Sequence, residues 1–263
     1  MTLRVDSDGP TTVVTISRLS VRNAVDSATA SELFAAFQRI DADDDCRVAI
    51  LTGDGGTFCS GADLGAVSAD GGNRVDPMPP ATDATDHLPG PMGPTRMRLS
   101  KPVVAAVEGY AVAGGLELAA WCDLRVAASD AVFGVFCRRW GVPLVDGGTV
   151  RLPRLIGHSR AMDMILTGRA VAAPEAFEWG LVNRLSEPGQ ALADAKAVAA
   201  EIAAFPPRCV VSDRRSALEQ WSLSEYDALA YETMLGRDTI ASGETMEGAT
   251  RFASGEGRHG HFA

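Results

Sequence analysis

The sequence predicts an α/β fold, on the strength of three observations. Strand-like and helix-like segments alternate through the first fifty residues. A buried strand at residues 101–107 leads into a segment of helical composition that begins at paired glycines. From residue 190 onward every segment has a helical pattern. We therefore expect a strand-rich core followed by a helical end.

The elements follow from local pattern. Residues 3–5 and 12–16 alternate apolar and polar side chains around Asp8-Gly9-Pro10, which predicts a hairpin. Apolar side chains recur at helical spacing over 27–40, and 48–51 has the composition of a buried strand. Further strands are expected at 123–127, 131–133 and 181–185. Helices are expected at 147–155, 160–166, 174–179, 191–205, 207–221, 224–241 and 244–253.

The segment from Gly65 to Pro94 is rich in Gly, Pro, Asp, Ala and Thr and has almost no apolar period. A long stretch of this kind inside a compact domain is usually an active-site lid or a disordered loop. We expect it to be a mobile loop. No repeat of 20 to 50 residues is visible, so the common solenoid families are not supported.

Composition excludes several functions. The 263 residues include 24 Lys and Arg against 34 Asp and Glu, for a formal net charge of −10. Nucleic-acid binding needs clustered cations, and here the cations are scattered. No run approaches the ~20 apolar residues of a membrane span. Asp6, Asp8 and Arg18 lie where a signal peptide would be apolar, so we expect a cytoplasmic protein without membrane insertion.

The cysteines and histidines do not predict a metal site. The five cysteines are odd in number and never spaced as CxxC, which favours reduced thiols. His87, His158, His259 and His261 have no third ligand nearby in sequence, and we interpret them as solvated residues.

Two glycine-flanked turns are candidates for chemistry. One is Phe58-Cys59-Ser60-Gly61-Ala62-Asp63-Leu64 and the other is Ala113-Gly114-Gly115-Leu116-Glu117. Each follows a predicted strand and leads toward a helix, so each could present unpaired backbone N–H groups. Two converging donors would form an oxyanion hole, although such glycines are more often steric accommodations. Neither turn fits GxGxxG or GxxxxGK[ST], so a nucleotide phosphate is not the natural ligand.

Three strings in this order resemble the enoyl-CoA hydratase/isomerase, or crotonase, family. They are FCSGADL at 58–64, KPVVAAVEGYAVAGGLELAAWCD at 101–123 and the segment 147–183. The similarity runs from Arg22-Asn23-Ala24 to the tail at 248–252. The resemblance implies a crotonase-like spiral of ββα repeats with a C-terminal helical trimerisation region. We accordingly expect residues 1–195 to form the spiral core with an acyl-CoA site, and 196–263 to assemble a homotrimer or a hexamer.

The resemblance also implies a reaction. Members bind acyl-CoA thioesters and stabilise an enolate-like oxyanion with two backbone N–H groups, which by motif position belong to Ala62 and Gly114. One such donor typically lowers the barrier by about 2.7 to 4 kcal/mol. Glu117, three residues after Gly114, occupies the position of a carboxylate that holds and deprotonates water. A surface glutamate is the alternative, but its apolar neighbours favour a catalytic role.

The second carboxylate of the hydratases is missing. Those members usually carry Phe-Gly-x-Pro-Glu, whereas this chain has Phe133-Gly134-Val135-Phe136-Cys137. A neutral thiol with an ordinary pKa of ~8.5 is a poor substitute for a carboxylate. Asp146 lies at or next to a position where some isomerases and dehalogenases of the family place a working aspartate, or it is a turn residue before two glycines. Cys137 as a nucleophile is a further alternative, with only Arg138 and Arg139 nearby.

By resemblance, the segment 19–24 and the residues before Ala62 line the path of coenzyme A. Arg22 is a candidate phosphate contact, or a surface arginine. Phe252 matches the C-terminal residues with which family members reach the CoA of a neighbouring subunit. The full set expected to contact CoA is Arg22, Ala24, Ser60, Ala62, Asp63, Leu64, Gly114 and Phe252.

These residues point to an enoyl-CoA hydratase that needs no cofactor, because CoA arrives as part of the substrate. Two alternatives remain open. The same fold could carry out double-bond isomerisation or another enolate reaction such as decarboxylation, with one carboxylate. Alternatively, the chain could be a non-catalytic acyl-CoA carrier or scaffold that lost the second acid. Glu117 favours an enzyme, and the absent glutamate favours a carrier.

Overall fold

The computed structural model describes residues 2–80 and 88–257. They form two compact units, Met1–Ala200 and Glu201–Ala263. This division and the boundary predicted after residue 195 both fall inside one helix, α7 (Ala191–Ala204). Of the predicted solvated histidines, His158 is exposed. His87, His259 and His261 lie outside the described residues.

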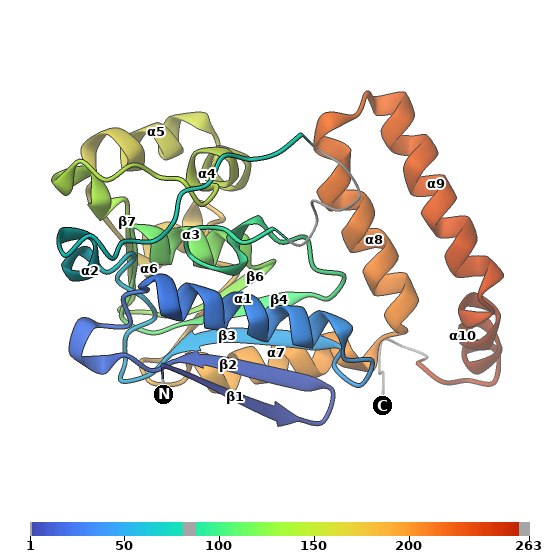
Figure 1. Ribbon diagram of the computed structural model, residues 1–263. Helices are drawn as coiled ribbons and strands as arrows, with labels where there is room; N and C mark the ends of the chain where they lie inside the picture. The colour runs from blue at the N-terminus through green and yellow to red at the C-terminus, as the bar shows by residue number, and fades with distance from the viewer. Residues whose placement is uncertain (1, 81–87, 258–263) are drawn as a thin grey trace. The chain divides into compact units, whose positions relative to one another are not determined.

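A six-stranded sheet organises the first unit, with the strand order β1-β2-β3-β4-β6-β9 (Figure 1). Strands β1 and β2 pair in antiparallel register, with Leu3 opposite Ile16, and every other neighbouring pair is parallel. The predicted hairpin is therefore confirmed. The strands are β1 (Leu3–Asp8), β2 (Thr11–Ile16), β3 (Val48–Gly53), β4 (Val103–Val107), β6 (Leu124–Ala128) and β9 (Arg184–Ser186).

A second, three-stranded sheet contains β5 (Tyr110–Val112), β7 (Val132–Gly134) and β8 (Ala170–Ala172). The chain passes from the large sheet to the small one between β4 and β5, and again between β6 and β7. Cys59 adds an isolated parallel bridge to Ala111 at the edge of β5. This repeated passage gives the spiral of ββα units that the resemblance implied.

Helices complete the first unit. They are α1 (Ser27–Ala42), α2 (Leu64–Ser68), α3 (Gly114–Trp121), α4 (Gly148–Ile156), α5 (His158–Thr167), α6 (Ala173–Glu178) and α7, with the short 3₁₀ helices η1 (Leu19–Val21), η3 (Pro94–Arg96) and η4 (Phe136–Trp140). Most of these agree with the elements predicted from periodicity.

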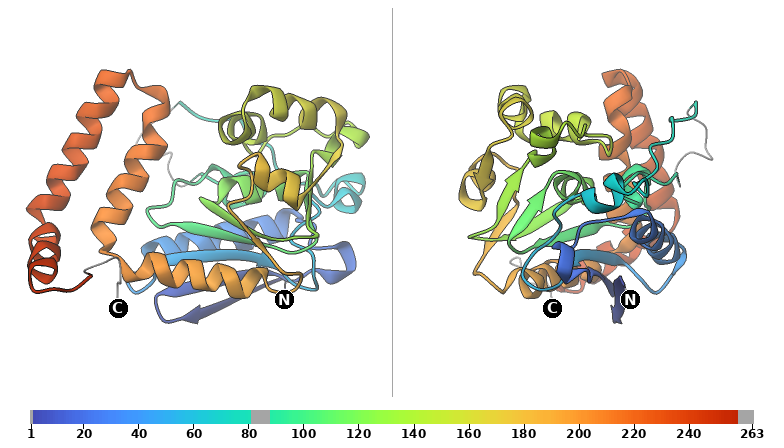
Figure 2. Two further views of the ribbon diagram at one scale, coloured as in Figure 1. Left: turned by 180° about the vertical axis from the view of Figure 1, so that it is seen from behind. Right: turned by 60° about the vertical axis from the view of Figure 1, so that its left-hand side comes forward.

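Helices α1 and α7 cover opposite faces of the large sheet, as Figures 1 and 2 show. Successive strand residues point to opposite faces, so β3 contributes side chains to both faces of the sheet. Leu51 belongs to the same core cluster as Leu33 and Phe37 of α1. Ile50 is equally buried but lies outside that cluster, and α7 buries Ala195. Burial on both faces explains why residues 48–51 of β3 form a continuous apolar run rather than alternating.

The second unit is helical, as the pattern predicts. It contains α8 (Pro207–Glu219), the 3₁₀ helix η5 (Gln220–Ser222), α9 (Glu225–Ala241) and α10 (Glu244–Ala253). Glu244 accepts hydrogen bonds from the backbone N–H groups of Arg208 and Cys209, which joins the start of α10 to the start of α8. Among the described residues, no helix is both long and apolar enough to cross a membrane.

Some sequence-based expectations were wrong. The loop predicted from Gly65 to Pro94 is wrong at its two ends. Residues 65–68 belong to helix α2, which Asp63 caps by accepting from the N–H groups of Gly65 and Ala66, and Gly90 and Gly93 close a hydrogen-bonded turn. Residues 71–80 form no helix or strand, and 81–87 lie outside the described residues. Strands β5 and β8 were not predicted, because three residues are too few to show a period. The last strand begins at Arg184 rather than at residue 181.

Candidate active site

Backbone geometry brings the two glycine turns together. The Cys59 N–H donates to Tyr110 O at 2.9 Å, and the Val112 N–H donates to Cys59 O at 3.1 Å. These bonds align the first turn with the edge of β5. Gly61 then adopts φ 101°, and a Cβ built on it would lie 3.1 Å from the backbone N of Gly114. Only glycine fits such an approach at this backbone angle.

The second turn is set by an unusual residue. Ala113 has φ 54° and ψ −125°, and its N–H donates to Gly134 O at 2.8 Å. A positive φ at a non-glycine residue is uncommon and persists when its surroundings hold it. Here it turns the chain from β5 into α3, so that Gly114 becomes the first helical residue.

The N–H groups of Ala62 and Gly114 are available as donors. Within residues 2–80 and 88–257, neither donates to a protein acceptor. The neighbours of Ala62 are engaged, because Gly61 O accepts from the Val25 N–H and Asp63 N–H donates to Val25 O. The N–H of Gly114 is open because the first residues of a helix have no intrahelical acceptor.

Glu117 is a buried acid of this region. It lies on α3 with 2% of its surface exposed. Its Oε1 accepts backbone hydrogen bonds from Asp146 at 2.9 Å and from Gly148 at 2.8 Å. Burial and the nearby Asp146 charge raise the pKa of Glu117 to about 7. A carboxyl with such a pKa both accepts and returns protons near neutral pH.

Asp146 and Cys137 lie close to Glu117. Asp146 is 3% exposed, and its Oδ1 accepts from the Met92 N–H at 2.9 Å and from the Thr95 hydroxyl. Burial raises the pKa of Asp146. Cys137, in η4, is 7% exposed, and burial, followed by the charge of Glu117, raises the pKa of its thiol. A raised thiol pKa disfavours the nucleophilic thiolate.

The segment expected to contact CoA runs beside the first turn. Ser60 donates its N–H to Arg22 O and its hydroxyl to Val21 O. Arg22 is exposed and Ala24 is buried. Leu64 is exposed at the start of α2. Phe252 belongs to α10 of the second unit and is 63% exposed.

Sequence reasoning missed the residues that hold this segment. The buried Asn23 side chain accepts from the Arg18 N–H and donates to Asp54 O and Thr57 O. The Arg18 guanidinium forms ion pairs with Asp26 at 2.7 Å and with Asp63 at 3.1 Å. These two aspartates cap α1 and α2. The aspartates were readable as caps, but nothing in the sequence linked them to Arg18.

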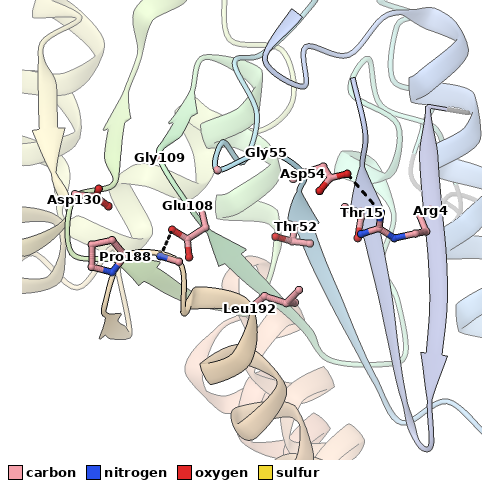
Figure 3. A pocket seen from close by; sticks show the side chains of 13 residues that line it. Arg4, Thr15, Thr52, Asp54, Gly55, Glu108, Gly109, Asp130, Pro188 and Leu192 are labelled. Atoms are coloured by element: carbon pink, nitrogen blue, oxygen red, sulfur yellow. Dashed lines mark hydrogen bonds and ion pairs between the residues drawn. The ribbon is translucent and has the colours of Figure 1, made fainter. Parts of the chain in front are cut away.

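An open pocket of about 430 Å³ lies elsewhere in the first unit (Figure 3). Its lining includes Asp54, Glu108 and Leu192, and none of the residues predicted for the site. The Glu108 carboxylate accepts from the N–H groups of Gly189 and Ala191, where α7 begins. Glu108 therefore has a capping role there.

The family model of enoyl-CoA hydratase/isomerase matches residues 8–262, nearly the whole chain. The chain belongs to the enoyl-CoA hydratase/isomerase family. Among relatives of this family, the enoyl-CoA hydratase EchA19 of Mycobacterium tuberculosis is 38% identical over 256 residues, covering 95% of this chain and 92% of the relative. The (E)-benzylidenesuccinyl-CoA hydratase of Thauera aromatica is 38% identical over 209 residues, with 78% and 77% covered.

Solved structures agree with the enoyl-CoA hydratase/isomerase assignment. The crystal structure of enoyl-CoA hydratase EchA1 from Mycobacterium marinum is similar to this chain with a TM-score of 0.87 at 37% identity. The similarity covers 96% of each chain. The crotonase fold predicted from the motifs is therefore confirmed.

Proposed function

We propose that the chain is an enzyme, an enoyl-CoA hydratase that adds water across the double bond of a trans-2-enoyl-CoA in fatty acid metabolism. The observation that carries this proposal is the state of Glu117. One carboxylate oxygen is fixed by two backbone N–H groups. The other accepts no hydrogen bond from the described protein, so it is free to bind water.

In this mechanism Glu117 takes a proton from water, and the resulting hydroxide bonds to C3 of the enoyl group. The electron pair of the C2–C3 double bond forms a double bond between C1 and C2, and the π pair of the thioester carbonyl moves to its oxygen, which gives an enolate. The N–H groups of Ala62 and Gly114 donate to that oxygen, where the negative charge develops. The proton then passes from Glu117 to C2, which restores the thioester. Apart from the CoA of the substrate, no cofactor takes part in these steps.

The CoA moiety is proposed to run along Arg22, Ala24 and Ser60 toward Asp63 and Leu64. The hydrogen bonds of Ser60 to this segment support that path, because they keep it next to Ala62. Phe252 is proposed to contact CoA in a neighbouring subunit. We also propose a cytoplasmic location, which the five free thiols support.

The second unit is proposed to assemble a homotrimer or a hexamer. Helices α9 and α10 contain no buried residue, yet they carry large exposed apolar side chains. Such surfaces are typical of protein interfaces. The apolar residues that are exposed in α8, η5, α9 and α10 include Leu218, Trp221, Tyr226, Leu229, Met234, Ile240, Met246 and Phe252. Light scattering of the full chain measures its mass, and a monomer would contradict this assembly.

A hydration assay tests the enzymatic proposal. Purified protein is incubated with crotonyl-CoA and longer trans-2-enoyl-CoAs, and loss of the conjugated thioester absorbance is followed. Turnover supports the hydratase. Absence of turnover with acyl-CoA binding retained in calorimetry would contradict it and favour a carrier.

Isomerisation is the second candidate, and Cys137 favours it. Moving a double bond requires one carboxylate that removes and returns a proton, and Glu117 is sufficient for that. A 3-enoyl-CoA substrate distinguishes the two reactions. An isomerase produces the conjugated absorbance from it, whereas a hydratase leaves a 3-enoyl-CoA unchanged.

A further inference from the structure

Asp146 connects three parts of the site through separate atoms. Its backbone N–H donates to Glu117 Oε1 at 2.9 Å. Its backbone carbonyl accepts from Arg151 Nη1 at 2.7 Å. Its Oδ1 accepts from the Met92 N–H and the Thr95 hydroxyl. Asp146 therefore ties the acid-bearing helix α3, helix α4 and the segment that leads into η3.

The segment that contains Met92 is held tightly. Gly90 and Gly93 exchange backbone hydrogen bonds at 2.7 and 2.9 Å. Arg151 Nη2 donates to Thr95 O at 2.7 Å, so α4 holds the segment as well. A Cβ on Gly90 would lie 2.9 Å from Asp146 Oδ1. The close approach of Gly90 leaves the carboxylate enclosed.

Met92 is what this arrangement places against the oxyanion turn. Its side chain is 1% exposed. A Cβ built on Gly114 would lie 2.7 Å from Met92 Sδ, so the thioether packs directly on the α-carbon of Gly114. The position of the Gly114 amide is thus linked through Met92 to the Asp146 carboxylate.

We propose that Asp146 is a positioning residue, whose backbone holds Glu117 and whose side chain holds Met92 against Gly114. This inference rests on the proposed hydration reaction. It assigns the proton transfers to Glu117 alone. Asp146 keeps the Glu117 carboxylate and the Gly114 N–H in their positions relative to each other. The two hydrogen bonds that Asp146 Oδ1 accepts from the protein favour this positioning role, in which Asp146 is the anchor of Met92.

The Asp146 charge adds an effect on pH dependence. The charged or titratable groups that face Glu117 are Asp146 before α4, Arg151 on α4 and the Cys137 thiol on η4. Asp146 is the like charge among them and favours protonation of Glu117. Asparagine at this position keeps an acceptor for Met92 and Thr95 but removes the charge.

The test compares Asp146→Ala, Asp146→Asn and Thr95→Val with Asp44→Asn, which removes an exposed charge outside the site. Asp146→Ala should lower kcat by about 10²-fold, as loss of one oxyanion donor does, with KM changed by less than about threefold. The kcat of Asp146→Asn should be at least about tenfold higher than that of Asp146→Ala. Asp146→Asn should also move the acid limb of the kcat/KM profile to lower pH. Thr95→Val, which keeps the Met92 bond, should fall between Asp146→Ala and wild type.

Two results would overturn the proposal. If Asp146→Asn loses as much kcat as Glu117→Gln, Asp146 itself transfers a proton. If Asp146→Ala only lowers the melting temperature while kcat stays at the wild-type value, the residue is structural. Thr95→Val keeps the test decisive if the alanine variant fails to fold, because a wild-type kcat in that variant would also contradict the anchor.

A spectroscopic measurement separates this inference from the proposed function. Butyryl-CoA cannot be hydrated, and the infrared stretch of its thioester carbonyl falls when the oxygen accepts hydrogen bonds. Wild-type protein should lower that frequency, and Asp146→Ala should reduce the shift while calorimetry still detects binding. If wild type does not hydrate enoyl-CoA but shows this difference, the hydratase proposal fails and the anchor stands. An unchanged shift in Asp146→Ala removes the anchor.

Discussion

Gly148 donates its backbone N–H to Glu117 Oε1 across 2.8 Å, and a Cβ at position 148 would lie 2.9 Å from that same oxygen. Gly148 is the first residue of α4, so its N–H lies at the positive end of the helix dipole. This contact stabilises the charged form of Glu117 against burial. It also requires a residue without a side chain.

We expect Gly148→Ala to displace the Glu117 carboxylate, because the added methyl group and the oxygen cannot both keep their positions. A displacement approaching 1 Å costs up to about 10²-fold in kcat, and we expect a loss toward that size. Steady-state kinetics with crotonyl-CoA measures it. Gly236→Ala in α9 is the matched control, since a Cβ there meets nothing within 4 Å. Equal kcat in the two variants would show that the contact does not position the acid.

Glu117→Gln should abolish hydration while acyl-CoA binding is retained. The amide oxygen can still accept from Asp146 and Gly148, so the loop geometry is preserved, but the side chain cannot accept a proton. General acid–base catalysis is worth about 10²- to 10⁴-fold, and we expect a loss at the upper end. Kinetics and calorimetry are compared with Glu178→Gln, an exposed glutamate. Undiminished turnover would remove Glu117 from the reaction.

The rate should depend on the ionisation of Glu117. Since the carboxylate must be deprotonated to accept a proton from water, kcat/KM should rise with pH through about 7, the raised pKa of Glu117. A profile of kcat/KM from acidic to alkaline pH measures this limb. An ascending limb near the ordinary carboxylate pKa of ~4.3 would contradict the assignment.

The fold was largely predictable from the sequence because its main elements are long and periodic. The hairpin alternates apolar and polar side chains, β3 and β4 contain buried apolar runs, and α1 and the C-terminal helices show a helical period. Strands β5 and β8 could not be found in this way. Their position depends on pairing with β7, which is a contact between distant residues.

The candidate site was predictable only where a motif marks it. The motifs pointed to Ala62, Gly114 and Glu117 as candidates, and the missing glutamate at Cys137 was visible by comparison with the family pattern. The contacts of Asp146 were not, because Met92 and Thr95 lie more than fifty residues earlier in the chain. The role of Asn23 was hidden for the same reason: its partners Asp54 and Thr57 lie in another loop.

The buried Glu117 should make folding stability depend on pH. Its pKa is raised in the folded state from 4.5 to about 7, so the folded chain binds more protons than the unfolded chain between these values. The contribution of Glu117 to the free energy of unfolding is fully present below pH 4.5 and is lost as pH rises through about 7. The free energy of unfolding of Glu117→Gln minus that of wild type should therefore be larger at pH 8 than at pH 4.5. The expected increase is roughly 3 kcal/mol. Urea unfolding at both pH values measures this, and an equal difference at both would contradict the raised pKa.

Cys137→Glu should increase hydration by restoring a second carboxylate beside Glu117. The thiol is buried and close enough to Glu117 that the carboxylate charge helps to raise the pKa of the thiol. Two neighbouring carboxyls push their pKa values apart, which supplies one acid and one base. We expect a gain in kcat of at least about tenfold with crotonyl-CoA, within the range that a general acid provides. Cys137→Gln introduces a side chain of the same size as glutamate but without the acid, and it should give no gain in kcat. If both variants hydrate equally, the missing second acid does not limit the rate of hydration.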